Sequence, residues 1–242
     1  MTKTEQLNLL FEDWDKARKC YNEENNHDLF KFCLDGIIDE KEFNKQKIKV
    51  LFISNEANLG EDFKHRDETN NVYDRRINFL EYKKEQYDEW VGKLRERVSA
   101  LYQVIKNDYK DPIYSVADQF AFINLNKRGG TDKCDIGHLE KYCSAYKEEI
   151  IKEIEIISPD LIVWLGCNSF DSTIPETLGF EKTEDGYIAY LLLKSLNKKI
   201  SALRMWHTST RSRMAETINV FPHNRIIDKL ATKLYQELER IK

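Results

Sequence analysis

The chain has 242 residues, of which 41% are hydrophobic and 33% are charged, with a formal net charge of −4. This length fits one sizeable domain with a packed core, and no apolar run approaches the roughly 18–20 residues that cross a bilayer. The first residues lack the pattern of a signal peptide, and the five cysteines are scattered without a C-x-x-C pair. We therefore expect a cytoplasmic protein with free thiols and without membrane association.

The first half of the chain begins with a helical pattern. Apolar residues at helical spacing predict an N-terminal helix, namely Leu7, Leu10, Phe11 and Trp14. Residues 1–47 are expected to form a helical extension of the domain. A short apolar run predicts the first strand at residues 49–55. A long helix is predicted next, by Tyr87, Trp90, Leu94, Val98, Leu101 and Ile105.

The second half alternates between strands and helices. Strands are predicted at residues 120–125, 160–166 and 200–206, with an additional or edge strand at 187–193 and a turn at 128–132. One amphipathic helix is predicted before Ser158-Pro159, by Leu139, Cys143, Tyr146, Ile150, Ile154 and Ile157. Asn224 is expected to cap a final helix. This alternation predicts a single domain, residues 1–242, with a three-layer α/β/α architecture and a central, mainly parallel four-stranded sheet.

Polar residues lie at the carboxyl ends of three of the four core strands. The first strand leads into Asn55 and Glu56, the second into Asn124 and Lys127, and the last into His207. Because open α/β sheets bind ligands at the carboxyl ends of their strands, we expect these side chains to lie close together. The sequence therefore predicts a functional site at one edge of the sheet.

The order of these motifs resembles the uracil-DNA glycosylase superfamily, in particular the branch whose first motif reads G-E-x-P-G. Glu56 and Ala57 match the E-x of that motif, Asn124 with Lys127 the second motif, residues 159–166 the third, and His207 with Ser209 the ends of H-P-S. The match spans roughly residues 48 to 212. It departs from the family at three loop positions, where Asn55 replaces Gly, and Asn58 and Thr208 replace Pro.

The resemblance implies a site that hydrolyses an N-glycosidic bond. Glu56 would place the water and His207 would donate to the leaving base, while Asn124 would read the base edge because an amide offers a donor and an acceptor together. Phe63 would stack on the extruded base. The remaining substrate-binding residues are expected to be Asn55 and Lys127, with phosphates held by Ser209, Arg211 and Ser212.

The expected function has two versions. The first is a DNA glycosylase acting on uracil or another modified base, and the second is a non-catalytic protein of the same fold that binds a nucleotide or nucleic acid. Glu56, Asn124 and His207 favour the enzyme, whereas the altered loop and the negative net charge favour the binder. The expected partner is DNA or a nucleotide, and the expected state is a monomer.

No cofactor and no metal site are expected. Some members of the resembled branch carry an iron–sulfur cluster on four cysteines, and Cys134 and Cys143 fall where two such ligands could lie. The N-terminal C-x-x-C is absent, however, and Cys20 and Cys33 stand far apart. Since a cluster needs four converging thiolates, buried free thiols are the simpler prediction.

Overall fold

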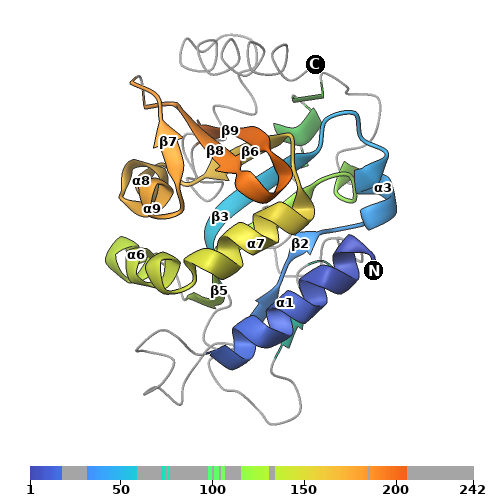
Figure 1. The fold of residues 1–242 in the computed structure, drawn as a ribbon, viewed down its shortest axis with the longest axis horizontal. Coiled ribbons are helices and arrows are strands. Elements are labelled where there is room, and N and C mark those ends of the chain that lie inside the picture. Colours follow the sequence, from blue (N-terminus) through green and yellow to red (C-terminus); the bar gives the residue numbers. More distant parts are fainter. Residues whose placement is uncertain are drawn as a thin grey trace.

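The computed structural model describes residues 1–17, 32–58, 72–74, 76, 98–99, 101–103, 105–106, 116–130, 134–184 and 186–205. In this part of the chain the strands form a seven-stranded mixed sheet and a separate two-stranded sheet. Helices pack on the larger sheet, with α1, α6 and α7 on one of its faces (Figure 1). The architecture is therefore α/β, as the sequence predicts.

Four parallel strands form the centre of the larger sheet. In spatial order they are β5 (Ala121–Gly130), β3 (Val50–Asn58), β6 (Leu161–Leu165) and β9 (Lys198–Met205), each parallel to its neighbours. The four predicted core strands are confirmed. β3 and β5 continue beyond their predicted carboxyl ends, because pairing between them extends through their polar residues, and the turn predicted at 128–132 begins inside β5.

Three further strands widen this sheet, so the prediction of four strands is wrong in number. β2 (Gly36–Ile37) pairs antiparallel with β5, while β8 (Ile188–Leu193) pairs antiparallel with both β9 and the edge strand β7 (Phe180–Lys182). The strand predicted at 187–193 is thus an inner strand. The two-residue β2 carries no apolar periodicity of its own, so only its pairing with β5 identifies it as a strand.

The described helices are α1 (Lys3–Ala17), α3 (Glu40–Asn44), α6 (Ile136–Ala145), α7 (Lys147–Ile157), α8 (Cys167–Asp171) and α9 (Ile174–Thr177), with a 3₁₀ turn at Lys194–Leu196. The single helix predicted before Ser158 is two helices, because the backbone leaves helical geometry at Tyr146 (φ −110°, ψ 25°). α7 ends at Ser158 in the left-handed conformation that is common at helix C-termini, immediately before Pro159, which cannot continue a helix. None of the described helices is long and apolar enough to cross a membrane.

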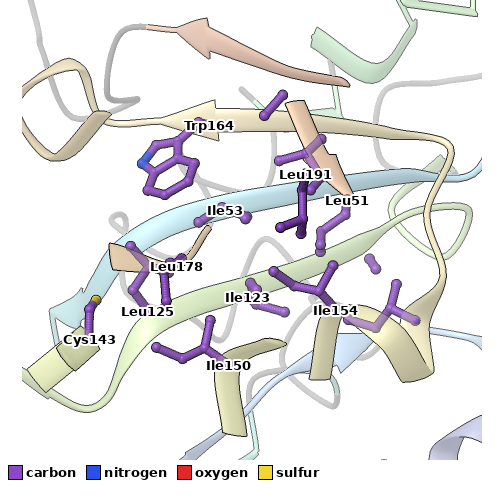
Figure 2. Packing of buried hydrophobic residues seen from close by; sticks show 14 of the residues in the cluster. Leu51, Ile53, Ile123, Leu125, Cys143, Ile150, Ile154, Trp164, Leu178 and Leu191 are labelled. Atoms are coloured by element: carbon purple, nitrogen blue, oxygen red, sulfur yellow. The ribbon is translucent and has the colours of Figure 1, made fainter. Parts of the chain in front are cut away.

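Hydrophobic residues pack against both faces of the sheet. On one face, Ile150 and Ile154 of α7 lie against Ile123 of β5 and Leu51 of β3 (Figure 2). On the opposite face a second cluster joins strand residues to three buried helical residues, Val98, Tyr102 and Ile105. Apolar side chains on both faces explain why the central strands appear in the sequence as continuous apolar runs.

The N-terminal residues belong to the core. α1 contributes Leu7, Phe11 and Trp14 to the cluster beneath α7, and the segment after it adds β2 to the sheet. β1 (Phe32–Leu34) pairs in parallel with β4 (Val72–Asp74) to form the small sheet. The prediction that residues 1–47 form a helical extension is therefore wrong in part, because this segment also contains strands. The sequence could not show this, since burial of α1 and pairing of β2 both depend on distant segments.

Candidate functional site

The order of the central strands creates a switch point between β3 and β6. From β3 the chain passes to β5 on one side and then returns to β6 on the other side of β3. In open α/β sheets ligands bind in the region outside the carboxyl ends of strands at such a point. The residues at these ends are Asn55 and Glu56 of β3, Gly166 after β6, and Ser169 of α8.

Asn55 is held in one orientation by α8. Its Oδ1 accepts a hydrogen bond from the Ser169 hydroxyl, and that hydroxyl oxygen accepts one from Trp164 Nε1 at 3.0 Å. The absence of a side chain at Gly166 makes room for this contact, because a Cβ there would lie 2.6 Å from Asn55 Oδ1. The side chain of Asn55 is therefore buried and fixed beside Glu56.

Glu56 is the carboxylate of this site. Its Oε2 accepts a hydrogen bond of 3.2 Å from Asn126 Nδ2, and Asn126 is directly opposite it in the β3–β5 pairing. The other end of the Asn126 amide accepts a 2.9 Å hydrogen bond from the Arg128 backbone N–H, which fixes the amide's orientation. Glu56 itself is only partly exposed to solvent.

Burial raises the pKa of Glu56 above its ordinary value. The Asn126 hydrogen bond opposes this shift, and the nearby charge of Asp135 adds to it. A carboxylate with a raised pKa is a stronger base than an exposed one, and such groups are common at catalytic sites. Glu56 therefore combines a fixed position with an altered acidity.

Cys134 lies close to the same residues. Burial and then the charge of Glu56 raise its pKa to about 12, although a hydrogen bond with Asn55 lowers it. Because the thiolate is the reactive form of cysteine, this thiol is neutral and unsuited to act as a nucleophile at neutral pH. Cys33, Cys134 and Cys143 are free thiols, and the described part of the chain contains no group of three His, Cys, Asp or Glu residues that could hold a metal ion.

Asn124 and Lys127 point to partners inside the protein. The Asn124 amide donates to Asp35 Oδ2 at 3.0 Å, and the Lys127 ammonium lies between the carboxylates of Asp35 and Glu153. All four side chains are almost completely buried. Contact with a substrate requires an accessible side chain, so the structure gives Lys127 a structural role in place of the predicted substrate-binding one, and the Asn124 amide is likewise bonded to Asp35.

The other predicted site residues lie outside the described residues, namely Phe63, His207, Ser209, Arg211 and Ser212. Of the predicted site residues, the structure therefore places Asn55 and Glu56 at the end of β3, and the proximity of His207 to Glu56 stays a prediction.

Four residues important to this region were not identified by sequence reasoning. Asn126 could have been found from the sequence, because it lies two residues after the predicted site residue Asn124 and therefore on the same face of a strand. Glu153 could also have been found, since it stands three residues after Ile150 on the buried face of α7. Asp35 and Ser169 could not, because their partners are 89 and 114 residues away in the chain.

Comparison with known proteins gives no family for this chain, since no family model matches it and no curated protein matches it. The resemblance to the uracil-DNA glycosylase superfamily therefore depends on the motifs between residues 48 and 212.

Proposed function

We propose that the protein is a divergent DNA glycosylase that hydrolyses the N-glycosidic bond of uracil or another modified base. The observation that carries the proposal is Glu56, a carboxylate held by Asn126 at the carboxyl end of β3, beside the switch point of the sheet. It occupies the position at which the resembled family places a glutamate. In this role Glu56 positions the attacking water and supports the positive charge that develops on the sugar.

The surroundings of Glu56 suit this chemistry. Partial burial weakens solvent screening, so the carboxylate acts more strongly on a developing oxocarbenium ion than it would in bulk water. Its raised pKa brings the group closer to neutral pH, where a general base is most effective. The fixed amide of Asn126 holds one carboxylate oxygen and leaves the other for water.

The proposed donor to the departing base is His207. β9 is parallel to β6, with Met205 paired to Leu165, and the sequence continues from Met205 into the motif that contains His207. An imidazole that stabilises charge present only in the transition state affects turnover more than binding. We expect His207→Ala to lower turnover by about 10²–10³-fold with little loss of DNA affinity.

The test is an excision assay on single-stranded and duplex oligonucleotides that contain uracil or one of a panel of other modified bases. Glu56→Gln should abolish excision while binding to the same oligonucleotides persists. Glu181→Gln is the matched control, because Glu181 is an exposed glutamate on the edge strand β7 and should retain full activity. Excision should also rise with pH through the raised pKa of Glu56, since the ionised carboxylate is the active form.

The alternative is a non-catalytic protein that binds a nucleotide or nucleic acid. Two observations favour it: Asn124 and Lys127, to which the resemblance assigns substrate recognition, are bound to Asp35 inside the protein. In that case the wild-type protein excises no base and yet binds oligonucleotides. Arg211→Ala would then weaken binding to all sequences and reduce its salt dependence, as loss of a phosphate contact does.

A further inference from the structure

A cluster of three ionisable side chains lies inside the protein, away from Glu56. Asp35 precedes β2, Lys127 is on β5 and Glu153 is on α7, and the side chains of all three have an exposed fraction of 0%. The Lys127 ammonium donates to a carboxylate oxygen of Asp35, and to Glu153 Oε1 at 2.9 Å. These contacts join three elements of the fold at one point.

Aromatic rings and an amide complete the environment of the cluster. The centroids of the Phe11 and Trp14 rings of α1 each lie 5.3 Å from Lys127 Nζ, and Asn124 donates its backbone and side-chain N–H groups to Asp35 Oδ2. The next ion pair along β5, between Arg128 and Asp15 of α1, is separate and internally balanced. Lys127 is thus the cation that both buried carboxyl groups share.

The charges in this cluster do not balance if both carboxyl groups are ionised. One ammonium and two carboxylates would leave a net charge of −1 in an interior without water exposure. Burying an uncompensated charge is far more costly than protonating a carboxylate, and two carboxylates at one site cannot easily both ionise. Of the two, Asp35 is better held as a carboxylate, because it accepts the backbone and side-chain N–H groups of Asn124, whereas a hydrogen bond with Asp35 favours the protonated form of Glu153.

We propose that Asp35, Lys127 and Glu153 retain one proton in the folded protein at neutral pH, with Glu153 in its acid form, so that the buried cluster is neutral. The cluster is then a pH-sensitive contact between α7, β5 and the segment before β2. Burial raises the pKa of Glu153. The charge of Asp35 adds to this shift and Lys127 opposes it, and the raised pKa agrees with a protonated Glu153. Burial alone would lower the pKa of Lys127, but Asp35 and Glu153 raise it, so the ammonium stays charged.

The sign of the pH dependence follows from this shift. An unfolded Glu153 loses its proton near the ordinary pKa of 4.5, whereas the folded protein keeps it to higher pH. The stabilisation from this group is therefore complete below the unfolded pKa and is lost as the pH rises through the folded pKa. Between the two values each rise of one pH unit increases the unfolding equilibrium constant about tenfold, which is a loss of about 1.36 kcal/mol of stability.

The experiment compares unfolding of the wild-type chain and Glu153→Gln by urea between about pH 5 and pH 8. Glutamine copies the shape of the protonated acid and cannot ionise. As the pH rises, the unfolding constant of the wild type should increase relative to that of Glu153→Gln, by up to about tenfold per pH unit. Glu148→Gln is the control, because Glu148 is exposed on the same helix, and its profile should follow the wild type.

Two results would overturn the proposal. A constant difference between wild type and Glu153→Gln across this range would mean that folded Glu153 is ionised. A pH dependence that disappears in Asp35→Asn and persists in Glu153→Gln would place the proton on Asp35. Should Glu153→Gln fail to fold, the ¹³C chemical shift of the Glu153 carboxyl group in the wild-type protein decides, since an acid-form shift at neutral pH supports the proposal and a carboxylate shift refutes it.

Discussion

Replacing Gly166 with alanine tests how tightly the switch point is packed. A Cβ at this position would lie 2.6 Å from Asn55 Oδ1 and 2.9 Å from Ser169 Oγ. Both atoms belong to buried side chains that are hydrogen-bonded to one another, and Ser169 also accepts from Trp164. Neither side chain can move aside without breaking a buried hydrogen bond.

The expected loss of stability follows from these contacts. Overpacking a well-filled interior costs about 1–3 kcal/mol. A net contribution of about 1 kcal/mol is typical of a buried hydrogen bond, and the Asn55–Ser169 bond is the one most directly displaced. We expect Gly166→Ala to lower the free energy of unfolding by about 2–4 kcal/mol.

Urea denaturation measures this loss as a lower midpoint with an unchanged slope. Asn55→Gly removes the atom that the new Cβ would meet, so the double variant should lose less than the sum of the single variants, with a coupling of at least about 1 kcal/mol. Gly137→Ala is the matched control. It lies in α6 with its nearest contact at an ordinary 3.4 Å, and it should gain up to about 1 kcal/mol from helix propensity.

A Gly166→Ala protein whose stability lies within about 0.5 kcal/mol of the wild type, the size of an ordinary surface substitution, would contradict tight packing at this position. Strict additivity of Gly166→Ala and Asn55→Gly would refute it as well. Either result would mean that Asn55 is not fixed against α8, and that Glu56 beside it is less rigidly placed than the structure indicates.

Three further changes have defined outcomes. Lys127→Met leaves the carboxyl groups of Asp35 and Glu153 buried without a cation and should cost about 3–5 kcal/mol in urea denaturation at neutral pH; a loss below about 1 kcal/mol would contradict the ion cluster. Glu56→Gln should raise the melting temperature relative to wild type more at pH 8 than at pH 5. The pKa of Glu56 is raised in the folded protein, so the wild type loses the stabilising protonated form as the pH rises, and equal shifts at both pH values would contradict this. Ser158→Gly should stabilise the protein by up to about 1 kcal/mol in thermal unfolding, since Ser158 has a φ of 51° that glycine adopts without strain; a lower melting temperature would contradict it.

The predicted strands and helices were correct where the pattern is local. The apolar runs at β3, β5, β6 and β9 are buried on both faces, so each run reads as a strand without knowledge of its partners. The spacing of Leu7, Phe11 and Trp14 likewise identifies the buried face of α1. The boundaries of elements were predicted less well. One helix was predicted where two are separated at Tyr146, because the helical spacing of apolar residues continues across the break.

The candidate site was predicted only in part. The carboxyl end of β3 with Asn55 and Glu56 follows from an apolar run that ends in polar residues, whereas the switch point beside it is known only from the strand order of the folded sheet. The partners of these residues, Asn126 and Ser169, were not predicted. Ser169 reaches Asn55 only because β6 lies beside β3 and α8 turns back over the strand end, and no local pattern encodes that meeting.

By itself the sequence determined the α/β class, the four central strands, the N-terminal helix and the glutamate at the end of β3. These properties depend on the spacing of apolar residues over a few turns or a few strand positions, which is set locally. Only the tertiary structure decided whether a given polar residue faces solvent or the interior. Lys127 illustrates this difference, since a lysine after a strand looks like a surface cation until Asp35, 92 residues away, and Glu153, 26 residues away, are brought to it. Burial of that ammonium is stable because distant carboxyl groups balance its charge, and this balance exists only in the folded chain.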